Sequence, residues 1–366
     1  MRRRSNRWVW QLGLAMLAAV TAVASAQTAT APPQSRQPSS LSIDFDPVPS
    51  PDPDNAPGTP TAPGAAPESR DVVRENGKFT LRENATEVRL NASVIDASGR
   101  SVESLTKDAF HVYEDGVPQT IASFRHEDLP VSLGILIDSS GSMYDKRTAV
   151  DAASINLVRL SNRQDEAFLV DFSSEAYIDQ DFTSDIAKLQ SGLSYVKSSG
   201  GTALYDAVVA SADYLSKNAK QPKQVLLIIT DGDDNASIAS LPQTIERVQD
   251  LDGPAIYAIG LLFGDDSDRR ESRHAREVLS QLAEQTGGQA YFPKSLKEVD
   301  GIAAMVAQDI RTQYTIAYRS TKSPTLGGYR QVHVEAKEKG FRGLQVRTRT
   351  GYFPKVASTQ PPSPGQ

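Results

Sequence analysis

The sequence predicts an α/β fold: a doubly wound, mostly parallel sheet that is inserted in, or flanked by, a small β-sandwich. Two observations support this prediction. Between residues 128 and 313, continuous apolar runs alternate with helical patterns, which is typical of parallel strands covered by helices on both faces. On either side, in residues 71–127 and 314–356, short segments alternate apolar and polar residues, which is typical of strands with one buried face.

The α/β region contains apolar runs that predict strands, each bounded by Asp, Gly or Ser. These runs cover residues 131–137, 167–172, 225–229, 255–262 and 290–292. Helical patterns lie near residues 146–161, 184–197, 203–217, 241–251, 273–286 and 296–313. In the last of these, Val299, Ile302, Val306 and Ile310 fall on one face, so we expect this face to pack against the sheet.

The two flanking segments are β-rich. Apolar and polar residues alternate over 88–94 and again over 314–318, and Asp115-Gly116 is a hairpin-turn signal. A few strands on either side would be marginally stable alone. The simplest interpretation is therefore one sandwich built from both flanks, with the α/β domain inserted between them. Two unrelated small β modules are the alternative.

The N-terminus has the pattern of a secretory signal peptide, predicted to span residues 1–26. Four arginines within residues 2–7 precede an apolar stretch at 8–23, and Ala24-Ser25-Ala26 is a small-x-small cleavage signal. An uncleaved membrane anchor is the alternative, but the apolar stretch is shorter than the roughly 20 residues that span a bilayer. The pattern therefore predicts export to the periplasm or the extracellular space.

Composition predicts disordered segments and disfavours several classes of function. Residues 27–70 hold 11 of the 22 prolines and predict a disordered linker, and the tail at 357–366 has the same character. Removal of residues 1–26 takes away four positive charges and moves the net charge from −6 to −10, which disfavours nucleic-acid binding. The chain has no cysteine, which excludes disulfides and thiolate chemistry. After the signal peptide, no segment has the length and apolarity of a transmembrane helix.

Three segments of the α/β region place carboxyl and hydroxyl groups at one predicted edge of the sheet. Asp138, Ser140 and Ser142 follow the first strand, Thr202 precedes a helix, and Asp231 follows the third apolar run. Ligands of such domains bind at the carboxyl ends of the strands. The five side chains are hard oxygen donors, which suit Mg²⁺ or Mn²⁺. Only two of them are charged, so a cation that they hold would keep its electrophilic character. It could also leave a position for a carboxylate from outside.

This set resembles the metal-ion-dependent adhesion site of von Willebrand factor A domains. The Asp-x-Ser-x-Ser run, the later Thr before a helix and the Asp-Gly after an apolar strand match that site in order and spacing. The resemblance covers about residues 130–313 and implies a doubly wound sheet. It also implies that Ser140, Ser142 and Thr202 coordinate the cation, and that Asp138 and Asp231 bind it directly or through water.

The flanks carry a second, looser resemblance. Phe110-x-Val112-x-Glu114-Asp115-Gly116-x-Pro118-Gln119-x-Ile121, Tyr314-x-Ile316-x-Tyr318 and Arg349-x-Gly351-Tyr352 are similar to segments of exported bacterial proteins related to von Willebrand factor A. That family implies binding and supplies no known partner.

Two enzyme classes are alternatives to a binding role. A phosphatase of the haloacid dehalogenase type needs a second carboxylate two residues after its nucleophile, where this chain has Ser140, and metal-dependent hydrolysis of phosphate esters would revive that alternative. A serine hydrolase would place Ser140 or Ser142 in a G-x-S-x-G context, which is missing. The four histidines are expected to face solvent: His111, His126, His274 and His333.

Other polar groups near this edge keep two interpretations. Residues 233–235 either form a turn and cap after the strand or tune the charge of the site. The charged loop at 265–271 either contacts a ligand or is simply solvated. Asp171 either hydrogen-bonds into the site or belongs to a structural turn.

The sequence therefore predicts an exported binding protein and not an enzyme. Its α/β domain would hold Mg²⁺ or Mn²⁺ through Asp138, Ser140, Ser142, Thr202 and Asp231, and would capture a carboxylate on a partner protein. One hypothesis is adhesion or matrix binding outside the cell. The alternative is a periplasmic assembly or scaffold factor that recruits another exported protein.

Overall fold

The computed structural model describes residues 39–40, 72–75, 78–81, 87–160, 162–193, 198–263 and 269–355. The predicted signal peptide, the predicted tail and most of the predicted linker lie outside the described residues. Contacts divide the chain into Met1–Gln37 and Pro38–Gln366, and the described residues all belong to the second unit. Within the described residues, we find no helix that combines the length and the apolarity needed to cross a membrane.

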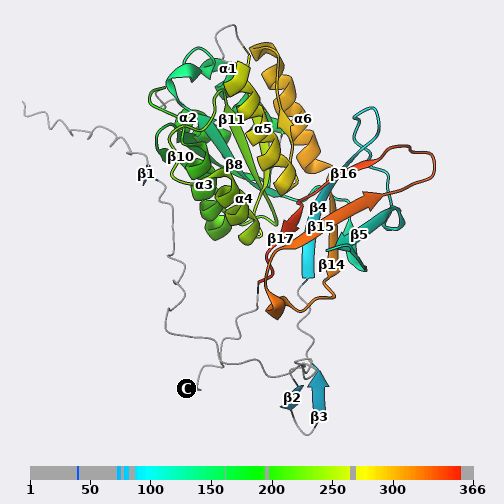
Figure 1. The fold of residues 1–366 in the computed structure, drawn as a ribbon. Helices are drawn as coiled ribbons and strands as arrows, with labels where there is room; N and C mark the ends of the chain where they lie inside the picture. Colours follow the sequence, from blue (N-terminus) through cyan, green and yellow to red (C-terminus); the bar gives the residue numbers. More distant parts are fainter. Residues whose placement is uncertain are drawn as a thin grey trace, which may run out of the picture. The chain divides into compact units, whose positions relative to one another are not determined.

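The largest sheet in the described part of the chain has seven strands, in the order β1-β10-β9-β8-β11-β12-β13. They are β1 (Ser39–Ser40), β8 (Val131–Asp138), β9 (Glu166–Phe172), β10 (Ala176–Thr183), β11 (Lys223–Thr230), β12 (Ala255–Gly260) and β13 (Ala290–Tyr291). From β9 through β13 neighbouring strands are parallel, whereas β10 is antiparallel to β9 and β1 is antiparallel to β10. The mostly parallel sheet confirms the predicted fold class (Figure 1).

Helices cover both faces of this sheet. They are α1 (Arg147–Leu160), α2 (Ile186–Leu193), α3 (Leu204–Asn218), α4 (Leu241–Asp250), α5 (Arg269–Thr286) and α6 (Val299–Arg311). One apolar core joins the sheet to α1, α2 and α6, and a second joins the other face to α3, α4 and α5. On β8, Ile135 and Ile137 belong to the first core and Leu136 to the second, so the strand is buried on both faces.

Strand β10 is absent from the sequence-based prediction. Its residues Asp179, Gln180 and Asp181 interrupt any apolar run, and most of the strand is only half-buried. The strand lies next to the edge of the sheet, where Ile178 and Tyr177 pair with Ser39–Ser40 of β1. These two serines are the only described residues of the segment predicted to be a disordered linker.

The flanks form two further four-stranded sheets within the described residues, in the orders β16-β4-β14-β7 and β17-β15-β5-β6. Their strands are β4 (Glu87–Ile95), β5 (Phe110–Glu114), β6 (Val117–Gln119), β7 (Ile121–Arg125), β14 (Tyr314–Arg319), β15 (Arg330–Ala336), β16 (Gln345–Arg347) and β17 (Gly351–Tyr352). Each sheet pairs strands from before and after the α/β domain, and both share one apolar core. The α/β domain is thus inserted in a sandwich. The hairpin of β2 (Val72–Glu75) and β3 (Lys78–Leu81) belongs to neither sheet.

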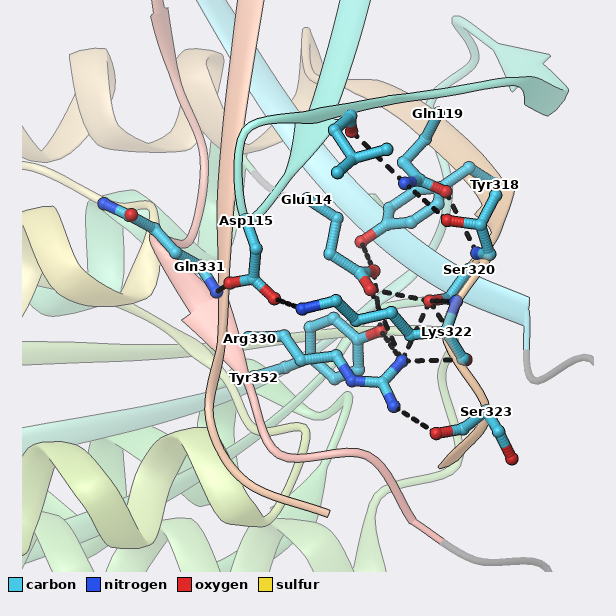
Figure 2. A network of polar contacts seen from close by, with 12 residues as sticks. Glu114, Asp115, Gln119, Tyr318, Ser320, Lys322, Ser323, Arg330, Gln331 and Tyr352 are labelled. Carbon is cyan, nitrogen blue, oxygen red and sulfur yellow. Dashed lines mark hydrogen bonds and ion pairs between the residues drawn. The ribbon is translucent and has the colours of Figure 1, made fainter. Parts of the chain in front are cut away.

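A buried ion pair joins two neighbouring strands of one sheet, β5 and β15, inside the sandwich (Figure 2). The carboxylate of Glu114 on β5 is 0% exposed, and the guanidinium of Arg330 on β15 lies 3.4 Å from it with 3% exposure. Glu114 also accepts hydrogen bonds from the hydroxyls of Tyr318 at 2.8 Å, Tyr352 at 2.9 Å and Ser320 at 2.6 Å. Burial and the neighbouring Glu114 carboxylate raise the pKa of Tyr352. The network ties together strands that are more than 200 residues apart in the sequence.

The predicted hairpin turn at Asp115-Gly116 connects β5 and β6. Both residues have positive φ, 48° for Asp115 and 79° for Gly116, which suits a tight turn between antiparallel strands. The Asp115 carboxylate also accepts a hydrogen bond from the backbone N–H of Gln331 at 2.9 Å and pairs with Lys322. The turn therefore also holds the start of β15.

Candidate metal-binding site

Asp138 and Asp231 lie at the carboxyl ends of two neighbouring parallel strands. Ile137 of β8 is in register with Ile229 of β11, so the residues that follow emerge at the same edge of the sheet. Asp138 is 0% exposed, and the side chain of Asp231 is also 0% exposed. The sheet therefore brings two buried carboxylates to the edge at which α/β domains bind ligands.

The Asp138 carboxylate is held in place by hydrogen bonds to both of its oxygens. The backbone N–H of Ser140 donates to Oδ1 at 2.8 Å, and the hydroxyl of Thr230 donates to Oδ2 at 2.5 Å. Burial raises the pKa of Asp138, and the nearby charge of Asp231 adds to this effect, while the hydrogen bonds from Thr230 and Ser140 oppose it. Two carboxylates that disfavour each other's charge are stabilised by a cation placed between them.

Ser140 and Ser142 link the first aspartate to the second. Their hydroxyl oxygens lie 3.1 Å apart, and the Ser142 hydroxyl donates to Oδ1 of Asp231 at 2.8 Å. Both serines sit on a tight loop that contains a short 3₁₀ turn, Gly141–Met143, and the side chain of Met143 is fully buried. This buried methionine anchors the loop, so the two hydroxyls are presented by a rigid segment.

Thr202 reaches the same place from the start of α3. The side-chain oxygen of Asn235 accepts a hydrogen bond from the Thr202 N–H at 2.9 Å. The Thr202 hydroxyl lies beside Gly232, the residue after Asp231: a Cβ added to this glycine would lie 3.7 Å from the hydroxyl oxygen. Thr202 is only 4% exposed. Its hydroxyl oxygen has no hydrogen-bond partner among the described residues and is not fully enclosed by protein, so a ligand can reach it. The structure thus brings together the five side chains that the sequence singled out.

Lys146 is a member of this cluster that sequence reasoning missed. Its ammonium group donates a hydrogen bond to Oδ2 of Asp231 at 2.5 Å, and its side chain is only 20% exposed. The lysine stands four residues after Ser142, on the same loop and directly before α1. That proximity was the one signal in the sequence that could have pointed to it.

The residues after Asp231 hold the beginning of α3. Oδ2 of Asp234 accepts hydrogen bonds from the backbone N–H of Tyr205 at 3.1 Å and from the Ser237 hydroxyl at 2.5 Å. Together with the Asn235–Thr202 contact, these bonds show the turn-and-cap role among the two interpretations of residues 233–235. Asp233 lies 3.3 Å from His274, whose side chain is 59% exposed.

Asp171 hydrogen-bonds to the loop that carries the candidate ligands. Its carboxylate accepts a hydrogen bond from the hydroxyl of Ser139 at 2.9 Å, and Ser139 separates Asp138 from Ser140 in the sequence. Residues 264–268, which make up most of the charged loop predicted at 265–271, lie outside the described residues. That prediction is therefore not examined by the structure.

Asp179 on β10 gives a test of pH dependence. Burial, the charge of Asp171 and a hydrogen bond with Asp171 raise the pKa of Asp179 to about 8, from 3.8 for an ordinary aspartate. Since the folded state then holds a proton that the unfolded state releases, this group's contribution to stability is present below about pH 4 and is lost as the pH rises through 8. We expect Asp179→Asn to unfold at a higher temperature than the wild type at pH 8.5, and at a similar temperature at pH 4.

Thermal unfolding of both proteins at the two pH values would measure this difference. Asp108→Asn, on an exposed 3₁₀ turn of the sandwich, is a matched control that removes the same charge. A difference between Asp179→Asn and wild type that stayed constant from pH 4 to 8.5 would contradict the prediction.

The donor set fits a small hard cation. The cluster offers two carboxylates and three hydroxyls, all oxygen ligands of the kind that Mg²⁺ and Mn²⁺ prefer. Among the described residues, no group of three or more His, Cys, Asp or Glu side chains gathers in a way that would hold a metal. A metal site at this edge would therefore depend on its serine and threonine hydroxyls as much as on its aspartates.

Comparison with known families bears on this geometry. Residues 133–233 match the sequence model described as the von Willebrand factor type A domain. Over these residues the chain is similar to a von Willebrand factor type A domain (VWA domain). The matched stretch includes all five candidate ligands of the VWA domain, as well as Lys146.

Three bacterial proteins are among the solved structures that align with this chain. A von Willebrand factor type A protein from Catenulispora acidiphila aligns with a TM-score of 0.42 and 15% identity, over 74% of this chain and 75% of that one. The PilB minor pilin from Streptococcus sanguinis aligns with 0.40 and 12%, over 50% and 62%. The pilus adhesin SpaC from Lactobacillus rhamnosus GG, in its open conformation, aligns with 0.42 and 12%, over 67% and 45%.

Proposed function

We propose that this protein is an exported binding protein whose VWA domain holds Mg²⁺ or Mn²⁺ and captures through it an acidic residue of a partner protein. The observation that carries the proposal is the convergence of Asp138, Ser140, Ser142, Thr202 and Asp231 at one edge of the sheet. Two buried carboxylates at this edge favour a cation, and the Thr202 hydroxyl, which makes no hydrogen bond to the described residues, can coordinate it.

Each side chain has a role that follows from its chemistry. Asp138 and Asp231 supply the negative charge that attracts the cation, while Ser140, Ser142 and Thr202 supply neutral oxygens. A bound divalent ion would supply the positive charge that attracts a carboxylate from outside. Because three of the five ligands are neutral oxygens, no third carboxylate of the protein competes with an incoming carboxylate for the ion.

We infer that the site binds and does not catalyse. The hydroxyls of Ser140 and Ser142 contact each other, that of Ser142 donates to Asp231, and among the described residues neither donates to a histidine. A nucleophilic serine needs a base within hydrogen-bond reach. The signal-peptide pattern of residues 1–26 supports the exported location.

Calorimetric titration of the full chain with MgCl₂ and MnCl₂ tests the proposal. We expect the wild type to bind one ion, and we expect Thr202→Val to bind it about tenfold more weakly, because valine keeps the shape of threonine without its hydroxyl oxygen. Thr120→Val, at an exposed position of the sandwich, is the matched control and should bind as the wild type does.

The capture step has its own test. Partner proteins retained by the immobilised chain from an exported fraction should be released by EDTA and regained on addition of MgCl₂. A wild-type protein that binds neither ion would overturn the metal site. Retention that is unchanged in EDTA would overturn the metal bridge even if the ion binds.

A further inference from the structure

Lys146 places a positive charge inside the proposed metal site. Its ammonium group is 2.5 Å from Oδ2 of Asp231, which is a short contact between two largely buried side chains. The backbone of the lysine is fixed as well, because its N–H donates to the carbonyl of Met143 at 3.0 Å and its carbonyl accepts from Val150 at 3.2 Å. The ammonium also lies 6.0 Å from the centre of the Phe263 ring, at the limit of a cation–π contact. The lysine is therefore held at the site.

The net charge of the site is the sum of the charges on its side chains and on the bound cation. Asp138 and Asp231 together carry −2 when ionised, and Lys146 brings the cluster to −1. A divalent cation bound to this cluster would leave +1, whereas the same cation bound without the lysine would leave a neutral site. A site with one residual positive charge attracts a carboxylate, and a neutral one does so much less.

We propose that Lys146 sets the balance between cation loading and carboxylate capture: its ammonium weakens the binding of the divalent ion and strengthens the binding of an acidic group to the loaded site. This inference rests on the metal site proposed above. The two effects have one cause. A fixed positive charge within a few ångströms repels a second cation that shares Asp231 and attracts an incoming anion.

A purely structural role for Lys146 leads to different results. If the lysine only neutralised Asp231 and kept the loop in place, its removal would disorder the ligands and weaken both the metal and the carboxylate. The proposed role requires the two affinities to move in opposite directions when the charge is removed. The sign of the two changes therefore decides between the roles.

The test uses the full chain and four variants. Lys146→Met removes the charge and keeps the length, Lys146→Gln removes the charge but can still donate a hydrogen bond to Asp231, and Lys146→Arg keeps the charge. Lys188→Met, at an exposed position on α2, is the matched control for the change in net charge. Circular dichroism and thermal unfolding establish that each variant is folded, and Lys146→Gln carries the test if Lys146→Met does not fold.

Two probes are measured. Calorimetry with MnCl₂ gives the metal affinity, and the relaxation of ¹³C-labelled acetate in the presence of the Mn²⁺-saturated protein gives the carboxylate affinity. We expect both neutral variants to bind Mn²⁺ about tenfold more tightly and acetate about tenfold more weakly than the wild type. Lys146→Arg and Lys188→Met should match the wild type in both measurements.

Failure of this inference differs from failure of the proposed function. If the wild type binds Mn²⁺ and the neutral variants change neither affinity, or lower both, the role of Lys146 is overturned while the metal site stands. If neither the wild type nor any variant binds Mn²⁺, the metal site itself is overturned and the inference falls with it. Tighter Mn²⁺ binding joined to weaker acetate binding in Lys146→Gln supports the inference.

Discussion

Asp231→Asn should lower the affinity for Mg²⁺ and Mn²⁺ by about 100-fold or more, since it removes one of the two ligand charges at the site. Asparagine keeps the shape of aspartate, and its side-chain oxygen can still accept the hydrogen bond that Ser142 now donates to Oδ1. The loss would therefore report the charge and not a collapse of the loop. Calorimetric titration with each metal is the measurement.

Thermal unfolding gives an independent readout of the same change. A ligand that binds only the folded state stabilises it by about 2.7 kcal/mol at a concentration 100 times its Kd. We therefore expect MgCl₂ to raise the unfolding temperature of the wild type, EDTA to reverse the rise, and Asp231→Asn to show neither response. Asp108→Asn is the control for the charge removed. Equal stabilisation of Asp231→Asn and wild type by MgCl₂ would show that the ion binds elsewhere.

The parallel part of the sheet could be predicted because its strands are buried on both faces. Such strands are nearly continuously apolar, and here each run is short and bounded by Asp, Gly or Ser, which favours a strand over a buried helix. The run predicted at 131–137 corresponds to β8 (Val131–Asp138), and the run at 225–229 lies within β11 (Lys223–Thr230). The ends differ by one to two residues, because polar residues such as Asp138 and Thr230 continue the strand beyond the apolar run.

Strand β10 could not be predicted in the same way. This segment forms a strand because it pairs with β9, and that tertiary contact leaves no apolar run in the sequence. Asp179 and Asp181 alternate with half-buried neighbours, and the register slips between Ile178 and Gln180 and again before Thr183. Ala176, Ile178 and Phe182 of the strand pack on the second apolar core, but polar residues separate them in the sequence.

The five candidate ligands could be placed together because the topology of the sheet brings their segments to one edge. Three of them share one loop, and parallel strands bring the others to the same edge. Lys146 is different, because its contact with Asp231 spans 85 residues and depends on the direction of a long side chain. Lysine on a loop is solvated in most proteins. Its place four residues after Ser142 marks it as a neighbour of the site, but its residue type predicts a solvated side chain and not one that points inward.

The buried ion pair of the sandwich was hidden for a related reason. Glu114 and Arg330 are 216 residues apart, and charged residues are rarely buried unless they are paired. The flank motif contained Glu114, Tyr318 and Tyr352 as isolated positions. Only the pairing of β5 with β15, and of the sheets with each other, shows that they belong to one network.

Removal of one partner of this ion pair should destabilise the protein strongly. We expect Arg330→Met to lower the free energy of unfolding by about 3–5 kcal/mol, because it leaves the Glu114 carboxylate buried without its cation. Lys322→Met is the matched control. It breaks an ion pair with Asp115 in which the lysine side chain is 43% exposed, and it should cost about 1 kcal/mol or less. Calorimetric unfolding of both variants beside the wild type measures the contrast.

The double variant Glu114→Leu/Arg330→Met shows how much of that cost comes from the uncompensated charge. With both charges gone, no ion remains buried, so the double variant should be more stable than the sum of the two single losses predicts, by about 0.5–3 kcal/mol. It should not reach the wild type, because the hydroxyls of Tyr318, Tyr352 and Ser320 would lose the carboxylate that accepts their hydrogen bonds. Strictly additive losses would mean that Glu114 and Arg330 act independently, and that their ion pair adds no stability of its own.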